Sequence, residues 1–331
     1  MATIKQVAQR AQVSIATVSY VLNGTGSVSP TKRQAVLDAV AALGYQPSYR
    51  GQALQSKRSM TLGLLLPSLG HRVADASFGA LLAGLVSGAA SNGYQILLAA
   101  SPMEETDAGV HGQLFRSGRV DGVIILDTHV EDQRIAAAQS ERLPYICAGK
   151  PANDSPFVSV DGVAGMIEAM AHLIVRGHER IGLLQPPLEQ TLADEQDAGY
   201  HEALSEAGIV FDPELVIEGG YTEGDGYAAT EELLALPEPP TAIVAGTAAL
   251  AFGSLHAIHD LGRNVGQDIA LISFEDTPAA AHVAPPLTAV RQPLRAWGQA
   301  LAHGLIAEIM GQTETRLVLQ PQLIVRRSCG E

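Results

Sequence analysis

The chain has few aromatic residues, two cysteines and no long apolar run. Aromatic residues make up 5% of its 331 residues, so the core must be built mainly from Ala, Val, Leu and Ile. Cys147 and Cys329 lie too far apart in sequence to form a disulfide framework, which favours a reducing compartment. No stretch of about 18 uninterrupted apolar residues occurs, and the N-terminus lacks the apolar core of a signal peptide. We therefore expect a cytoplasmic protein that does not contact the membrane.

The sequence also lacks the motifs of common enzyme classes. There is no Gly-Lys-Ser/Thr phosphate loop, no Gly-x-Ser-x-Gly elbow and no His-Glu-x-x-His helix. His256 and His259 lie three residues apart on a predicted helix without a third ligand nearby, so we expect a solvated helix face there. We predict that the protein is not an enzyme and has no catalytic residues, cofactor or metal site.

Positive charge is scarce overall but concentrated at one end. The chain carries a net charge of −14. Residues 1–58 hold seven Lys and Arg residues and one acid, Asp38, a net charge of +6, which leaves −20 for the remainder. This asymmetry is typical of a nucleic-acid-binding head on an acidic body, because an acidic body repels phosphate.

The first 45 residues predict three short helices. Their N-caps are Thr3, Ser14 and Ser29. Thr3 also forms a capping-box pattern with Gln6. The second helix covers residues 15–22, and Gly44 ends the third. Two short helices joined by a tight turn and braced by a third are typical of a helix-turn-helix domain.

The second of these helices presents small and polar side chains outward. They are Ile15, Ala16, Thr17, Ser19 and Tyr20. Any small three-helix bundle has N-caps and a polar face. Hydroxyl groups clustered at a helix start, beside a net charge of +6, instead favour a surface that binds DNA phosphates.

From residue 60 onward, apolar strands alternate with helices. Continuous apolar strands separated by helices are typical of parallel sheets that are covered on both faces. About 270 residues are too many for one such sheet, so we predict two similar lobes. The predicted strands cover residues 62–66, 95–99, 123–126, 145–148, 181–184, 242–245 and 269–274.

Several strings resemble, in order, the lactose-repressor/galactose-repressor (LacI/GalR) family. These motifs are specific in combination, and the resemblance covers nearly the whole chain. They are Thr3-Ile4-Lys5-Gln6-Val7-Ala8, Val13-Ser14-Ile15-Ala16-Thr17-Val18-Ser19, Val21-Leu22-Asn23-Gly24, Leu43-Gly44-Tyr45-Gln46-Pro47, Asn92-Gly93-Tyr94 and Gly177-His178-Glu179-Arg180-Ile181.

The resemblance implies an all-α helix-turn-helix head and an α/β two-lobed, periplasmic-binding-protein-like body with parallel sheets. Three crossovers would connect the lobes, near Asp161, Val290 and Pro321. The implied domains are a DNA-binding head (1–46), a hinge helix or linker (47–60) and an effector-binding and dimerisation body (61–331). Within the body, the N-lobe would have residues 61–160 and 291–320. The C-lobe would have residues 161–290 and 321–331.

The resemblance also implies which residues contact DNA. Ile15, Ala16 and Tyr20 would read bases, and Leu54 of the hinge would enter the minor groove as a wedge. The family commonly has Arg where this chain has Tyr20, so we expect a different base preference there. The implied phosphate contacts are Thr3, Ser14, Thr17, Ser19, Asn23 and Ser29.

For the effector, the resemblance implies a site between the lobes in which this chain departs from the family's usual residues. Gln196 replaces a frequent Arg, Gly246-Thr247 replaces a frequent Asn-Asp pair, and Glu275 stands where Asp is commoner. Gly246 would leave room for a larger glycoside. The implied effector-binding residues are Ser68, His71, Asp161, Gln196, Tyr221, Thr247 and Glu275.

We therefore predict a sequence-specific transcriptional regulator of a bacterial cell, located on the nucleoid when it is bound to DNA. We expect it to be a repressor that binds double-stranded operator DNA as a homodimer under the control of a small carbohydrate or glycoside. One alternative is a regulator with an altered or ligand-insensitive pocket, and another is one with a nucleoside-like co-repressor. A soluble sugar-binding module or an α/β enzyme would be a different class, for which a signal peptide or a catalytic constellation is missing.

Overall fold

A computed structural model describes residues 2–24, 26–45, 58–66, 76–100, 116–129, 131–186, 191–312 and 314–330. The chain divides into two compact units, Met1–Ser59 and Met60–Glu331. In these described ranges, no helix is both long enough and apolar enough to cross a membrane.

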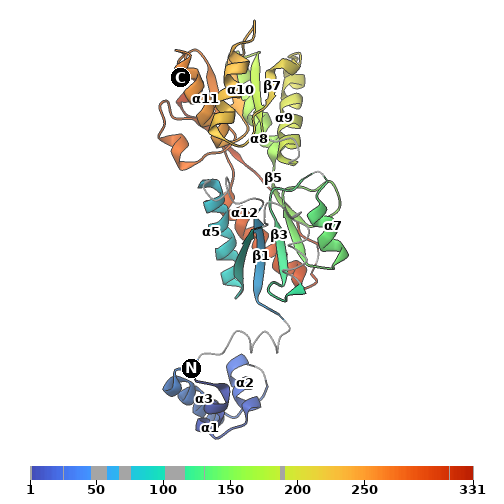
Figure 1. The fold of residues 1–331 in the computed structure, drawn as a ribbon, viewed down its shortest axis with the longest axis vertical. Coiled ribbons are helices and arrows are strands. Elements are labelled where there is room, and N and C mark those ends of the chain that lie inside the picture. The colour runs from blue at the N-terminus through green and yellow to red at the C-terminus, as the bar shows by residue number, and fades with distance from the viewer. Residues whose placement is uncertain are drawn as a thin grey trace. The chain divides into compact units, whose positions relative to one another are not determined.

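The described part of the first unit contains three helices packed as a bundle, α1 (Ile4–Ala11), α2 (Ile15–Asn23) and α3 (Pro30–Leu43) (Figure 1). The predicted capping box is present, because the Gln6 amide donates to Thr3 Oγ1 at 3.4 Å and the Thr3 amide donates to Gln6 Oε1 at 2.8 Å. All three predicted helix starts are confirmed. The buried core consists of Val7, Ala8, Val18, Val21, Val36 and Ala39.

The second unit contains two lobes, each built on a six-stranded sheet (Figure 1). The sheet of the first lobe has the order β11-β5-β4-β3-β1-β2, and all its strand pairs are parallel. Its strands are β1 (Thr61–Leu66), β2 (Gln95–Ala100), β3 (Gly122–Ile125), β4 (Tyr145–Ala148), β5 (Phe157–Val160) and β11 (Arg316–Leu319), and its helices are α5 (Ala76–Ser91), α7 (Gln133–Ser140) and α12 (Leu294–Ile309).

The second lobe has a sheet of order β12-β10-β9-β8-β6-β7, in which only the β10–β12 pair is antiparallel. Its strands are β6 (Ile181–Gln185), β7 (Val216–Glu218), β8 (Ala242–Ala245), β9 (Ala270–Ser273), β10 (Thr288–Arg291) and β12 (Gln322–Ile324). Its helices are α8 (Gly162–Ile174), α9 (Thr191–Ala207), α10 (Glu223–Leu234) and α11 (Ala248–Asp260), with short 3₁₀ turns at Pro213–Leu215, Pro278–Ala281 and Arg327–Cys329.

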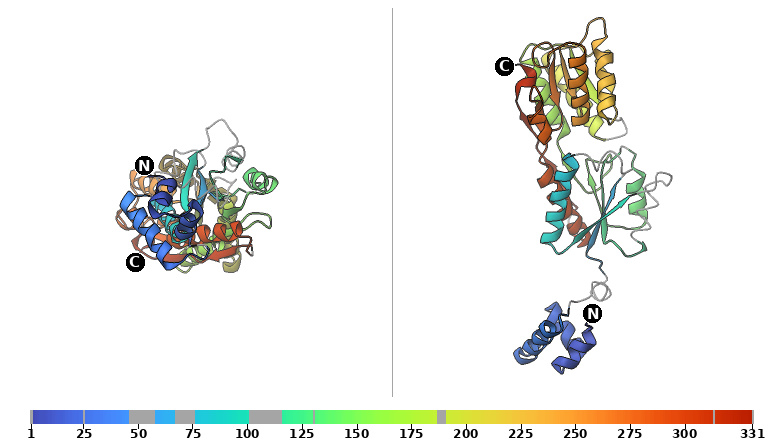
Figure 2. Two further views of the ribbon diagram at one scale, coloured as in Figure 1. Left: turned by 90° about the horizontal axis from the view of Figure 1, so that it is seen from below. Right: turned by 60° about the vertical axis from the view of Figure 1, so that its left-hand side comes forward.

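Helices cover both faces of each sheet, as the continuous apolar strands predict (Figures 1 and 2). In the first lobe, Leu62 and Leu64 pack with α5 and α12, whereas Val123 and Ile125 pack with α7. In the second lobe, alternate strand residues pack with α8 and α9 on one face and with α10 and α11 on the other. The predicted fold class, an α-helical head with a two-lobed and mainly parallel α/β body, is confirmed.

The chain passes between the two lobes three times. It crosses at Asp161 between β5 and α8, at residues 292–293 between β10 and α12, and at residues 320–321 between β11 and β12. The sequence placed the second crossing near Val290. The structure has it two residues further on, because Val290 itself lies within β10, paired with Leu323.

A buried carboxylate stands beside the second crossing. Asp276, with a side chain that is 3% exposed, forms ion pairs with Arg291 and with Arg326, each at an N–O distance of 2.7 Å. Arg326 also donates to the carbonyl oxygen of Leu287 at 2.6 Å. One carboxylate therefore ties the end of β10 to the C-terminal segment.

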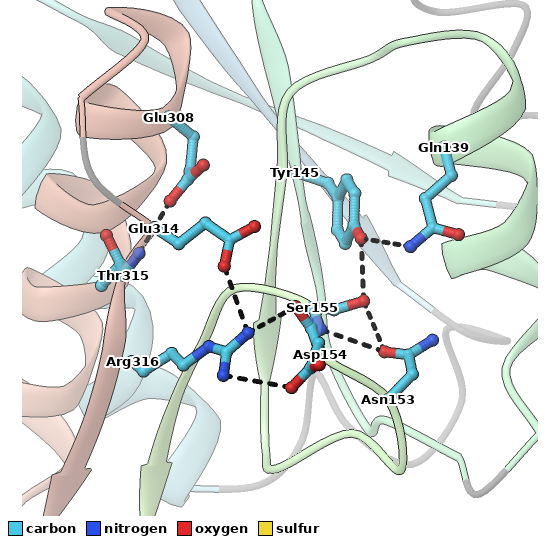
Figure 3. A network of polar contacts seen from close by, with 9 residues as sticks. All are labelled: Gln139, Tyr145, Asn153, Asp154, Ser155, Glu308, Glu314, Thr315 and Arg316. Carbon is cyan, nitrogen blue, oxygen red and sulfur yellow. Dashed lines mark hydrogen bonds and ion pairs between the residues drawn. The ribbon is translucent and has the colours of Figure 1, made fainter.

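Arg316 attaches the edge strand β11 to the rest of the first lobe (Figure 3). It donates to the carbonyl oxygen of Asp154 at 2.9 Å and pairs with the Asp154 and Glu314 carboxylates, each at 3.1 Å. Asp154 is 95% exposed, so water screens this ion pair.

Candidate functional sites

The outer face of α2 is the first candidate site. Ile15 is 44% exposed and Tyr20 is 48% exposed, and Ala16 is exposed beside them. Ile15 and Tyr20 do not contribute to the buried core of this small unit. Their exposed side chains are therefore candidates for contact with another molecule.

Hydroxyl groups lie at the starts of the three head helices. Ser14 Oγ accepts from the Thr17 amide at 3.1 Å and lies 2.9 Å from Thr17 Oγ1. Thr3, Ser14 and Ser29 are exposed, and Ser29 makes no capping hydrogen bond with its side chain. Thr17 and Ser19 are half-buried. These groups can face an anion, because helix N-termini carry partial positive charge.

Four of the predicted contacts lie outside the described part of the chain. They are Leu54, Ser68, His71 and the side chain of Asn23, and most of the predicted hinge, residues 47–60, lies there as well.

The second candidate site is a cleft between the two lobes. It encloses about 890 Å³, counting the solvent at its mouth. The ends of β4, β5 and β9 reach it through Ala148, Val160 and Phe274, and the first turns of α5 and α9 close its sides. Parallel sheets place ligand sites at the carboxyl ends of their strands, and both lobes do so here.

The cleft has an apolar lining with an aromatic side. Phe78, Phe274 and Trp297 line it together with several aliphatic side chains. Trp297 comes from α12, and its indole Nε1 donates to the carbonyl oxygen of Val158 at 2.8 Å. This hydrogen bond fixes the ring plane at the wall of the cleft.

Four acidic residues, Asp127, Asp161, Glu195 and Glu275, also line the cleft. The last three each accept a hydrogen bond from a backbone amide. Asp161 Oδ1 accepts from Ala164 at 2.9 Å, Glu195 Oε2 from Gly162 at 3.2 Å, and Glu275 Oε2 from Ala248 at 3.0 Å. The acids therefore keep a defined direction and can accept from hydroxyl groups of a ligand.

Glu195 has an unusual protonation equilibrium. Burial raises its pKa from 4.5 to about 7, and the carboxylates of Asp161 and Asp194 act in the same direction. The Gly162 amide and Lys150 oppose the rise in this pKa. Near neutral pH, a substantial fraction of the molecules therefore carries a proton on Glu195, which can then donate a hydrogen bond as well as accept one.

The structure places the predicted effector residues in different environments. Asp161 and Glu275 line the cleft, whereas Gln196, Tyr221 and Thr247 are not among its described lining residues. Tyr221 is 48% exposed. Thr247 caps α11, because its Oγ1 accepts from the Leu250 amide at 3.2 Å.

Gln196 is fully buried and occupies the space beside Gly246 that was predicted to be open. Its Nε2 donates to the carbonyl oxygen of Gly246 at 3.0 Å. A Cβ atom at position 246 would lie 2.5 Å from Gln196 Oε1 and 2.7 Å from Pro186. The prediction that Gly246 leaves room for a larger ligand is therefore wrong, because protein atoms already fill that room.

Sequence reasoning did not identify Glu195, Phe78, Phe274 or Trp297 as cleft residues. Glu195 directly precedes Gln196, in a segment from residue 189 to 197 that is rich in acidic residues. Consecutive residues on a helix point about 100° apart, so the choice between them depends on the rotation of the helix. The signal for Trp297 was its rarity, since the chain has one tryptophan.

Comparison with known proteins agrees with this architecture. The family described as bacterial regulatory proteins, lacI family, matches residues 3–48, and the periplasmic binding protein-like domain matches residues 170–329. The HTH-type transcriptional regulator CelR of Thermobifida fusca is 32% identical over 333 residues, 98% of each chain.

Two solved structures extend over the whole chain. A complex of the transcriptional regulator CelR with cellobiose is 32% identical, with a TM-score of 0.77, and covers 99% of this chain and 100% of that one. The lac repressor dimer bound to operator and the anti-inducer ONPF is 28% identical, with a TM-score of 0.87, and covers 100% of this chain and 99% of that one.

The helical head, the two-lobed body and these similarities define the chain as a DNA-binding transcriptional regulator. It belongs to the LacI family. The relatives reported above are regulators rather than enzymes.

Proposed function

We propose that this protein is a transcriptional repressor that binds a near-palindromic operator as a homodimer and is controlled by a carbohydrate or glycoside in the cleft between the lobes. Binding to chromosomal DNA would place it in the cytoplasm of a bacterial cell, on the nucleoid. The resemblance of the whole chain to the lac repressor dimer on its operator supports the dimeric arrangement.

On the DNA side, Ile15, Ala16 and Tyr20 would read base edges in the major groove. Their exposure on one face of α2 supports this role, as does the net charge of +6 over residues 1–58. Phosphate contacts would come from Thr3, Ser14, Thr17, Ser19, Asn23 and Ser29, and Leu54 would enter the minor groove at the operator centre as a wedge that kinks the duplex.

On the effector side, the observation that carries the proposal is the set of three anchored carboxylates beside Trp297. Carboxylates accept hydrogen bonds from vicinal hydroxyl groups, and an indole ring offers a flat face to the C–H side of a sugar. Apolar walls with a few oriented polar groups suit a carbohydrate better than a charged anion, which the acids would repel. CelR, which is similar over the whole chain, was solved with cellobiose.

Control of DNA binding would come from a difference in affinity. An effector that binds one arrangement of the lobes more tightly shifts the population toward that arrangement, and with it the spacing of the two heads in the dimer. The effector cleft and the DNA-binding surface need not touch each other for this coupling to operate.

Two measurements on the full-length protein test the proposal. Genomic fragments are selected with the purified protein at a stated salt concentration, because phosphate contacts make affinity depend on salt. We expect a short palindrome, and recovery of bulk DNA without a common motif would contradict operator recognition. Thermal unfolding is then measured with a panel of glycosides and nucleosides. Stabilisation by a glycoside is expected, whereas stabilisation by nucleosides alone, or by no compound, would contradict the carbohydrate assignment.

A further inference from the structure

The ring of Tyr20 lies directly against the backbone of Gly26, in the turn that follows α2. A Cβ atom at position 26 would lie 3.1 Å from Tyr20 Cγ, 3.3 Å from Cδ1 and 3.4 Å from Cδ2. These three ring atoms are the ones nearest the Tyr20 backbone. Gly26 therefore covers the inner end of the ring and leaves the hydroxyl end, on the opposite side of the ring, clear of this contact.

A second glycine in the same turn provides a direct comparison. Gly24 and Gly26 both have a positive φ, of 67° and 76°, so a side chain at either position carries a similar backbone cost. Among the described residues other than its chain neighbours and the backbone of its own helix, a Cβ atom at Gly24 would meet no atom within 4 Å. Only at Gly26 does the missing side chain also make room for another residue.

We propose that Gly26 is a positioning residue for DNA recognition, because its bare backbone fixes the direction in which the Tyr20 ring leaves α2. This inference rests on the proposed base-reading role of Tyr20. An exposed tyrosine on a helix can occupy more than one staggered χ1 rotamer, and contact along one ring face favours one of them. A side chain ordered before binding loses less conformational entropy on the DNA, and its single hydroxyl reaches the same base edge each time.

The inference predicts a change in specificity rather than a general loss of binding. A side chain at position 26 must push the ring by a few tenths of an ångström or more, because a Cβ–Cγ separation of 3.1 Å is tighter than ordinary van der Waals contact. The displaced hydroxyl then no longer meets its base, whereas a merely structural defect in the turn lowers affinity for all DNA sequences alike.

The experiment is selection from random double-stranded DNA with the full-length protein, comparing Gly26→Asn with the matched control Gly24→Asn. Asparagine tolerates a positive φ better than most residues, so both variants should fold, which thermal unfolding checks. We expect Gly26→Asn to reduce discrimination at one base position in each half-site about fivefold, and Gly24→Asn to leave it within about twofold. Gly26→Ala, with the smallest side chain, replaces Gly26→Asn if the latter does not fold.

The same substitution in a Tyr20→Ala background completes the test. Without the ring, Gly26→Asn should leave the selected motif of Tyr20→Ala unchanged. Equal behaviour of Gly26→Asn and Gly24→Asn, or an equal shift of the motif with and without the Tyr20 ring, would overturn the positioning role. If the wild-type protein selects no motif, the proposed function itself fails, which separates the two failures.

Discussion

The Thr191 amide donates a hydrogen bond of 3.1 Å to the carbonyl oxygen of Thr128, and so joins the first residue of α9 in one lobe to the segment after β3 in the other. Gly149 lies close to the same point, because a Cβ there would be 3.3 Å from Thr191 Oγ1 and 3.4 Å from Thr128 Oγ1. All three residues line the cleft. A ligand that separates the lobes on this side must break this hydrogen bond.

Removing this donor should loosen the contact between the lobes. Thr191→Pro deletes the amide hydrogen at the first position of a helix, where proline is tolerated. We expect the free energy of unfolding to fall by about 1 kcal/mol and the radius of gyration of the ligand-free protein to rise. Urea unfolding and small-angle X-ray scattering measure the two effects. Thr191→Ala is the control, because it loses the same hydroxyl group but keeps the amide. Its free energy of unfolding and radius of gyration should change less than those of Thr191→Pro. Equal changes in the two variants would contradict the prediction.

Glu195 should make stability depend on pH between about 4.5 and 7. In that window the native state holds a proton on Glu195, whose pKa is about 7, while the unfolded chain, with a pKa near 4.5, has lost it. The native state binds more protons, so the free energy of unfolding falls as the pH rises, by roughly 2 kcal/mol for this partly buried group.

Glu195→Gln should remove this part of the pH dependence, because the amide stays neutral throughout. Urea unfolding at several pH values between 5 and 8 checks it, and we expect the variant to gain stability over the wild type as the pH increases. The control is Glu202→Gln, an exposed position on the same helix, which should follow the wild-type curve. A Glu195→Gln curve parallel to that of the wild type would show that Glu195 does not titrate in this range.

The carboxylate of Asp276 should matter far more for stability than that of Asp154. Asp276→Asn leaves Arg326, whose side chain is 16% exposed, without its charged partner, and we expect a loss of about 3 kcal/mol. Asp154→Asn removes an ion pair in which the acid is 95% exposed, with an expected change below about 0.5 kcal/mol. Urea unfolding of both variants compares them, and similar losses would refute the importance of burial at Asp276.

Leu54, which lies outside the described residues, stays a predicted wedge. Leu54→Ala should weaken binding to the selected operator about tenfold or more, and binding to unrelated DNA much less, because a wedge acts only where the base step deforms easily. Fluorescence anisotropy with both duplexes at the same salt concentration measures this. Gln55→Ala is the matched control. Equal loss on the two duplexes would exclude the wedge.

The head could be predicted almost to the residue because its signals are local. Thr3 and Ser14 each accept from an amide three residues on, Pro30 follows Ser29 at the first position of α3, and Gly44 ends α3 through its own positive φ of 56°. Such signals need no knowledge of the rest of the fold.

In the body, the predicted strands match β1, β2, β3, β4, β6, β8 and β9, whereas β5 and β10 inside the sheets and β7, β11 and β12 at their edges were not predicted. β8 is a continuous apolar segment and β9 is apolar up to Ser273, and both are buried along their whole length. β7, β11 and β12 are short, partly exposed and begin with or contain polar residues, and they become strands only through pairing with distant partners. Arg316, for example, pairs in register with Phe157, which sequence patterns cannot indicate.

The cleft shows the same limit at the level of single side chains. Asp161 and Glu275 follow strand ends, whose position in a parallel sheet sends them to the cleft. Glu195 and Gln196 lie on a helix, and the packing of α9 against α8 decides that the acid faces the cleft and the amide faces Gly246. That rotation depends on contacts such as Gly199 against the backbone of Val163, which no local pattern encodes.

Trp297 gives the molecule an intrinsic optical reporter. It is the chain's single tryptophan, and it forms part of the cleft wall with its indole fixed to Val158. Its fluorescence emission therefore comes from one known position, and a compound that displaces water from the ring changes the emission of the whole protein. Occupancy of the cleft, and the rate at which it fills after rapid mixing, can thus be followed on the unlabelled wild-type chain, even before the natural ligand is known.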